Sequence, residues 1–445
     1  MFFHFNLEGE HVDNYPYEYK TELIEGKLQL YIDGKLFYED LSANVYELAQ
    51  QLAQWLLKIE SGQAVDFMYD CINREEHLLQ FHLEENRVHV YAPYEEQSFE
   101  PLSIETVKRA VLKYCIDLHI ALVRIGFKSL LEEPLKSLVS ENKWALILFE
   151  CNQYDEAFSR IEKLAKEKPS VESLNNYAYL LLHEEEDRER AWTILMQLLP
   201  LQPQSDFPYL MLGEIALHFN RFEEAKVYLQ QALAFKESEI ATHNLGIAHF
   251  SLGEFEQAAQ AFSRCTGDSG IVQLYEVVSW LRAGQIVKAK ALLDHFDDQA
   301  DDFIGYSEMA DVYIELGGFV EAHTLFAKEW NDHYTMPYSV SRYAYTLWQL
   351  MEYDACQQMV QQAILTKQEE IADEKLSAID ENWSEQDLAE RIEELEQQLH
   401  ELESLPSRLA QGCIPPFEFE LYTIGGCQLF GCPLHGHAEY VELVK

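Results

Sequence analysis

The residues best suited to chemistry lie close to the C-terminus. Two thiols and two imidazoles follow one another in the pattern Cys-x4-Cys-x2-His-x-His, at Cys427, Cys432, His435 and His437, with Cys413 upstream. Thiolate and imidazole groups are the ligands of tetrahedral Zn²⁺. The pattern therefore predicts a structural zinc site at these four residues, and no other cofactor is predicted.

A second interpretation is that these are ordinary turn and strand residues. The spacing differs from the usual Cys-x2-Cys knuckle, and two histidines at alternate positions need not converge with both thiols. A catalytic metal is not expected, because no acidic residue stands beside the cluster as a base. The wider sequence also lacks a Gly-x4-Gly-Lys-Ser/Thr phosphate loop, a Gly-x-Ser-x-Gly elbow, a His-Glu-x2-His pair and a Cys-x-x-Cys pair. We therefore expect no enzyme.

Small residues recur through the middle of the chain. Successive members are separated by 34, 34, 33, 31, 33 and 34 residues, and they are Ala157, Ala191, Ala225, Ala258, Ala289, Ala322 and Cys356. Twelve residues earlier, at repeat position eight, stand Ala145, Tyr179, Gly213, Gly246, Val277, Ala310 and Ala344. A period of about 34 residues predicts a helix–turn–helix solenoid. Small residues are needed where the two helices of each pair cross closely.

This pattern resembles the tetratricopeptide-repeat family over residues 138–370. The resemblance implies a mainly α fold, with about seven helix–turn–helix repeats and a groove that binds partners but has no chemistry of its own. In the family, first-helix positions two, five, nine and twelve line the groove. In this chain the predicted groove residues are Phe207, Leu210, Glu214, Leu217, His243, Ile247, Phe250, Asp311, Tyr338, Tyr345 and Trp348.

The predicted groove lacks the Lys and Asn that hold a peptide carboxylate in chaperone-binding members of the family. It is apolar and aromatic with a few acids. A helix or an aromatic-rich segment with basic flanks suits such a surface. The alternative is that single members of this set belong to the core between repeats.

Residues 1–133 are expected to form an α+β domain, with an antiparallel sheet packed on two helices. Asp33-Gly34 between alternating segments predicts a hairpin. Further strands are expected at 65–72, 78–83 and 88–91, one helix is expected to begin after Ser42, and another near Ser103. The arrangement resembles bacterial immunity-type α+β domains. A cap on the first solenoid helix is the alternative.

Two further segments follow the repeats. Residues 371–405 are predicted to form an acidic capping helix that Pro406 ends. Residues 406–445 form the C-terminal extension, expected as a short strand from Pro415 to Tyr422 followed by a Gly-rich turn with the Cys/His cluster.

The net charge of −44 argues against nucleic acid and anionic membranes as partners, and it favours a basic protein or peptide. The alternative is that the charge serves solubility. No stretch is apolar enough to span a bilayer, the N-terminus does not resemble a signal peptide, and the eight cysteines are scattered as in reduced proteins. A cytoplasmic location is therefore expected.

Together these features predict a non-enzymatic, protein-binding repeat protein. Its acidic solenoid would engage a basic protein or peptide, as a bacterial immunity or inhibitory protein. The alternative is a peptide-responsive regulatory sensor or scaffold, and a metal-dependent enzyme is the third hypothesis. No prediction of the oligomeric state follows.

Overall fold

The computed structural model describes residues 1–7, 24–69, 78–92, 99–265, 269–299, 303–331, 334–377 and 384–435. It divides into two compact units, residues 1–212 with 426–445, and residues 213–425. The described chain is mainly helical, with a small N-terminal sheet region, as the sequence predicted. Within the described ranges, no helix combines the length and the apolar character that a membrane span requires.

Two small antiparallel sheets open the first unit. One has the order β1–β2–β3, formed by Phe2–Leu7, Glu25–Ile32 and Lys35–Asn44. The other has the order β4–β5–β6–β7, formed by Phe67–Met68, Gln80–Glu84, Arg87–Tyr91 and Leu102–Ser103. The predicted hairpin is confirmed: Ile32 pairs with Lys35, and Asp33 and Gly34 have φ values of 51° and 75°. Two positive φ angles give the turn a twist that matches its strands.

Three helices, α1 (Val45–Glu60), α2 (Ile104–Arg124) and α3 (Glu132–Leu138), complete this region. Ser103 caps α2 as predicted. The predicted Ser42 cap of α1 is wrong, because β3 continues past Ser42 and the Asn44 side chain instead accepts the N–H of Glu47. Part of the predicted 65–72 strand lies outside the described residues.

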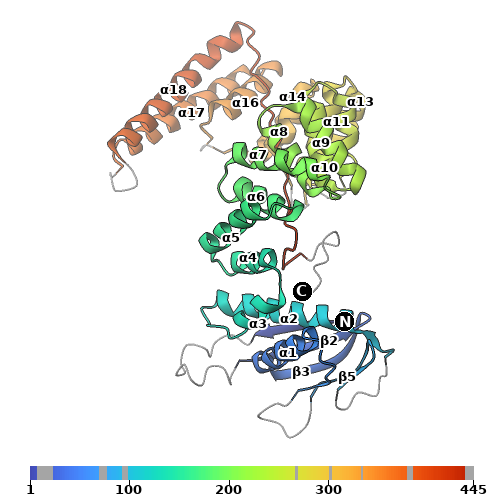
Figure 1. The fold of residues 1–445 in the computed structure, drawn as a ribbon. Coiled ribbons are helices and arrows are strands. Elements are labelled where there is room, and N and C mark those ends of the chain that lie inside the picture. The colour runs from blue at the N-terminus through green and yellow to red at the C-terminus, as the bar shows by residue number, and fades with distance from the viewer. Residues whose placement is uncertain are drawn as a thin grey trace. The chain divides into compact units, whose positions relative to one another are not determined.

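Seven helix pairs follow within the described parts of 141–374 (Figure 1). The first three pairs are α4 (Glu141–Glu150) with α5 (Tyr154–Glu167), α6 (Val171–His183) with α7 (Arg188–Leu198), and α8 (Phe207–His218) with α9 (Phe222–Phe235). The last four are α10 (Glu239–Ser251) with α11 (Phe255–Phe262), α12 (Gly270–Arg282) with α13 (Ile286–Leu293), α14 (Tyr306–Glu315) with α15 (Phe319–Glu329), and α16 (Pro337–Gln349) with α17 (Tyr353–Glu374). A short 3-10 turn, Leu199–Leu201, follows α7.

The crossing points explain the spacing of the small residues. All seven predicted crossing residues are 0–3% exposed. A Cβ added to Gly246 would lie 2.7 Å from the ring of Phe262, and one added to Gly213 would lie 2.6 Å from Leu229. The second repeat corrects the predicted register. Its turn has one extra residue, so buried Ala178 occupies the crossing and half-buried Tyr179 does not.

Each pair also turns through a left-handed residue five positions before its crossing residue. These residues have φ between 52° and 76°, and they are Asn152, Glu186, Asn220, Gly253, Gly284, Gly317 and Met351. Glycine and asparagine tolerate this conformation, whereas other side chains are strained in it.

The acidic segment differs from its prediction. It is divided between the end of α17 and a separate helix, α18 (Glu385–Ala410), which packs on α16 and α17. Pro406 lies inside α18 and does not end it. Proline removes one helical hydrogen bond. Leu402, Leu405 and Leu409 are buried on both sides of it, and this burial holds the last turns in helical form.

Candidate peptide groove and metal cluster

After α18 the chain runs in an extended conformation along first helices of the repeats. The predicted β-strand from Pro415 to Tyr422 is wrong, because the backbone there bonds to helix side chains and not to another strand. We call residues 413–435 the C-terminal segment. In the second unit, residues 417–420 alternate between half-buried phenylalanines and exposed glutamates. This period of two is that of an extended chain with one face against a surface.

Three side chains from the fourth and fifth repeats bond to the backbone of Tyr422 and Ile424 in this segment. The Asn244 amide donates to the Ile424 carbonyl (2.9 Å) and accepts the Ile424 N–H (3.0 Å). Nε2 of His243 lies 3.0 Å from the Tyr422 carbonyl, so it carries a proton there. The Tyr422 N–H in turn donates to the hydroxyl of Tyr275 (3.1 Å). Burial lowers the pKa of His243 and favours its neutral form.

The seventh repeat contributes a fully buried arginine. Arg342 donates to the carboxylates of Asp311 (2.8 Å) and Glu315 (3.0 Å) and to the carbonyl of Pro415 (3.2 Å). Its guanidinium also lies 5.4 Å from the centre of the Phe417 ring. Burial raises the pKa of Asp311, against the opposing effect of Arg342. The arginine thus joins the repeat and the segment in one network.

Aromatic contacts supply the apolar part of the groove. The ring of Phe419 lies 5.6 Å from that of Tyr275 and 5.8 Å from that of Phe250. Phe417 stacks on Phe419 at 5.8 Å. Pairs of this kind add to the free energy gained by burial alone.

The first unit holds residues 428–431 in the same manner, beside α4 and α6 (Figure 1). The Asn176 amide accepts the Phe430 N–H and donates to the Phe430 carbonyl, both at 2.8 Å. Asn175 donates to the Gln428 carbonyl (2.6 Å), and Lys143 to that of Gly431 (2.7 Å).

A shared repeat position unites these contacts. In five of the seven repeats, the side chain two residues before the first-helix crossing residue, at position six, bonds to the segment's backbone: Lys143, Asn176, Asn244, Tyr275 and Arg342. In the register of the structure, none of these five residues stands at the family's groove positions two, five, nine and twelve, and none was predicted as a groove residue. The recurrence of Asn, Tyr, Lys and Arg at one repeat position was the available signal.

Apart from Asp311, the predicted groove residues fall into three groups. Four contact the C-terminal segment: Phe207 through Phe430, His243 through Tyr422, Phe250 through Phe419 and Tyr338 through the backbone of Glu418. Three are almost fully buried: Leu210, Leu217 and Ile247. The others lie elsewhere: Glu214 is half-buried, Tyr345 packs on Phe319, and Trp348 packs on Tyr353.

Asp311 does not act as an acid open to a partner. It is 9% exposed and is paired with Arg342.

The Cys/His residues converge in the first unit. The ligand atoms of Cys427, Cys432 and His435 all lie within 4.8 Å of one another, and Sγ of Cys432 is 3.2 Å from Nδ1 of His435. A hydrogen bond from the Cys427 thiol lowers the pKa of Cys432 and raises that of Cys427. His437, the fourth predicted ligand, lies outside the described residues.

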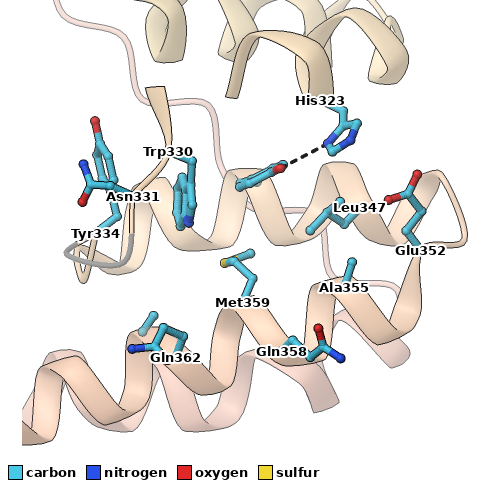
Figure 2. Close-up of a pocket in the computed structure, with 12 residues that line it drawn as sticks. His323, Trp330, Asn331, Tyr334, Leu347, Glu352, Ala355, Gln358, Met359 and Gln362 are labelled. Atoms are coloured by element: carbon cyan, nitrogen blue, oxygen red, sulfur yellow. Dashed lines mark hydrogen bonds between the residues drawn. The ribbon is translucent and has the colours of Figure 1, made fainter. Parts of the chain in front are cut away.

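A separate cavity of about 400 Å³ lies among α15, α16 and α17 (Figure 2). The ring of Trp330 stacks on that of Tyr334 at 4.8 Å, and the Tyr343 hydroxyl lies 3.2 Å from Nδ1 of His323. Met359 points towards these rings from α17. None of its lining residues was predicted as a site.

Comparison with known proteins gives two family matches. Residues 3–124 match a domain family described as a domain of unknown function (DUF7878), and residues 208–239 match the tetratricopeptide repeat. No curated protein matches the sequence.

Solved structures with similar folds are tetratricopeptide proteins. One from Parabacteroides merdae is 13% identical, with a TM-score of 0.41 over 59% of this chain and 100% of the other. The C-terminal part of a repeat protein from Cytophaga hutchinsonii is 16% identical, with a TM-score of 0.39 over 52% and 94%. YrrB, described as having an unusual peptide-binding site, is 15% identical, with a TM-score of 0.29 over 47% and 92%.

The helix pairs and their small-residue crossings define a tetratricopeptide-like solenoid, and residues 208–239 match the tetratricopeptide repeat itself. The N-terminal domain matches a family to which no function is attached, so the resemblance to immunity-type domains stays a prediction.

Proposed function

We propose that this protein binds a partner protein through an extended segment that enters the groove of the second unit in place of its own C-terminal segment. One observation carries the proposal: the Asn244 amide bonds to both backbone groups of Ile424. Such a contact accepts any extended peptide, because it involves no side chain of the ligand.

The C-terminal segment competes with any such partner. Helix α18 is packed on α16 and α17 and ends at Ala410, and Pro415 follows five residues later. A tether this short gives the segment an effective concentration of about the millimolar range. A partner therefore needs contacts that the segment does not make.

The contacts of the segment define the chemistry of the partner. Phe417 and Phe419 face the groove, while Glu418 and Glu420 are exposed. The chain has a net charge of −44. A partner segment with aromatic residues in place of Phe417 and Phe419, and with Lys or Arg in place of the two glutamates, would therefore gain electrostatic attraction. We therefore propose an aromatic, basic partner segment, and an inhibitory or immunity role in the bacterial cytoplasm, supported by charge alone.

A second candidate function is a peptide-responsive sensor. It is favoured by the same intramolecular contact, because displacement of the segment would free residues 413–425 for another interaction. A toxin gene beside this gene would support the first function, and a short secreted peptide would support the second.

The experiment uses a labelled synthetic peptide with the sequence of residues 413–425 and the full-length protein. The double variant Phe417→Ala/Phe419→Ala should bind this peptide about tenfold more tightly than wild type, because its own segment competes less well. Glu418→Ala is the matched control, since that side chain is exposed, and it should behave as wild type. Equal failure of all three proteins to bind the peptide would refute the groove proposal.

A second peptide with Lys in place of both glutamates tests the charge. It should bind more tightly than the first at low salt, and the difference should shrink as the Debye length falls from about 10 Å at 0.1 M to about 3 Å at 1 M. Identical affinities at low salt would exclude a basic partner for this groove.

A further inference from the structure

The Cys/His cluster is organised by its surroundings. Four residues separate Cys427 from Cys432, and Asn176 and Lys143 bond to two of them, Phe430 and Gly431. Gly431 has a φ of 81°, and the Cys432 N–H donates to the Leu429 carbonyl (3.3 Å). The loop that brings the two sulfurs together is therefore anchored to α4 and α6 by side chains outside the cluster.

The three ligand atoms stand close to the geometry of a zinc site. Tetrahedral Zn²⁺ has bonds of about 2.3 Å to sulfur and about 2.0–2.1 Å to imidazole nitrogen, which places ligand atoms about 3.5–3.8 Å apart. Here all three lie within 4.8 Å of one another, and Sγ of Cys432 lies 3.2 Å from Nδ1 of His435. Small side-chain rotations reconcile the two geometries.

The type of donor selects the metal. Two thiols and one imidazole suit zinc, whereas calcium and magnesium prefer oxygen ligands. Cys432 is buried and Cys427 is half-buried, whereas His435 is exposed. A metal at this point would therefore be shielded from solvent on the side of the sulfur atoms.

We propose that Cys427, Cys432 and His435 bind one Zn²⁺, and that the ion fixes residues 428–431 on α4 and α6. Any proton still on either thiol leaves to solvent on binding, because zinc binds the thiolate forms. Binding of zinc does not depend on the proposed function. Any effect of zinc on the exchange of the C-terminal segment with a partner does rest on that function.

Metal content tests the first part. Full-length protein purified without chelator should contain about one zinc per chain, and Co²⁺ exchanged into it should give the visible absorption of tetrahedral cobalt with thiolate ligands. Cys427→Ser and Cys432→Ser should each lower the zinc content strongly. Cys413→Ser is the matched control, since Cys413 is exposed and outside the cluster, and it should keep the zinc.

Wild-type protein without zinc, or with a Cys427–Cys432 disulfide in its place, would overturn the site. The cobalt spectrum of wild type keeps this test valid even if a variant fails to fold.

Hydrogen exchange tests the second part. Removing zinc with a chelator should speed exchange of the Phe430 amide by about tenfold or more, while the amide of Leu229 in α9 should not change. Zinc binding with unchanged exchange at Phe430 would overturn the claim that the ion holds the segment. Neither measurement uses a peptide ligand, so failure of the groove proposal would be recognised separately.

Discussion

The side chain of Asn244 forms a closed pair of hydrogen bonds with the backbone of Ile424, donating at 2.9 Å and accepting at 3.0 Å. Asn176 repeats the arrangement on Phe430. An amide is suited to this role because it offers a donor and an acceptor side by side. The contact depends on an extended backbone and not on the residue type that it holds.

Replacing Asn244 with alanine should release this part of the segment. The Ile424 N–H and carbonyl would lose partners in a partly buried place, at a cost of about 1–3 kcal/mol. We expect faster hydrogen exchange at Ile424 and faster proteolysis near Gly425. The matched control is Gln257→Ala on exposed surface of α11, which should change neither. Unchanged protection of Ile424 in Asn244→Ala would contradict the role of this contact.

The crossing in the fourth repeat should not accept a larger residue. Gly246→Ala places a methyl group 2.7 Å from the buried Phe262 ring, so it should lower the free energy of unfolding by about 1–3 kcal/mol despite the better helix propensity of alanine. Adding Phe262→Leu should recover part of this loss, because the smaller side chain leaves room for the methyl group. Chemical denaturation measures both, and additive losses would show that the clash is not the cause.

Met351 should be a site where substitution stabilises. It has a φ of 63° and is 75% exposed, so its backbone is strained while its side chain packs on little. The left-handed conformation costs a non-glycine residue about 1–2 kcal/mol, which glycine's greater flexibility in the unfolded chain offsets in part. Met351→Gly should therefore raise the free energy of unfolding by about 0.5–1 kcal/mol in denaturation experiments. Met351→Ala keeps the strain and should give no gain; an equal gain from alanine would refute this explanation.

The protein should become less stable as the pH is lowered, because His119 takes up a proton more readily in the unfolded chain. Burial lowers the pKa of His119 to about 4, whereas the unfolded chain has its ordinary value of about 6.5. The unfolded state therefore binds the proton first. The stabilising effect is complete above about pH 6.5 and is lost progressively between about pH 6.5 and 4, with a total of about 3 kcal/mol.

The measurement compares wild type with His119→Gln at pH 7 and pH 5. Nδ1 of His119 has no hydrogen-bond partner among the described residues, so glutamine should cost little at pH 7. The variant should then lose less stability than wild type on going to pH 5. Equal losses in both proteins would show that other groups account for the pH dependence.

Short-range patterns allowed most of the fold to be predicted. The crossing residues, the Asp33-Gly34 hairpin and the Ser103 cap each depend on local geometry, and each appears where the sequence placed it. The errors at Ser42 and Pro406 have one cause. Cap and proline signals are worth a few kilocalories per mole at most, and strand pairing of β3 and burial of the leucines on α18 outweigh them.

The site was harder to predict, because its ligand is part of the same chain. The extended run from Pro415 and its alternating phenylalanines could be recognised locally, although no β-strand forms there. Its location could not, because the bond between Asn244 and Ile424 joins residues 180 positions apart. The charged network of Arg342 with Asp311 was also hidden, since an acid at a groove position gives no sign that an arginine one repeat later neutralises it.

The short connection between Ala410 and Pro415 also affects how long a partner stays bound. Closure of a loop of about ten residues takes about 10–100 ns, which is far shorter than the time in which a departed protein returns by diffusion. Each departure would then be followed by reoccupation of the groove by residues 413–425 before a second encounter. Occupancy of the groove by a partner would then depend more on how slowly that partner dissociates than on its local concentration.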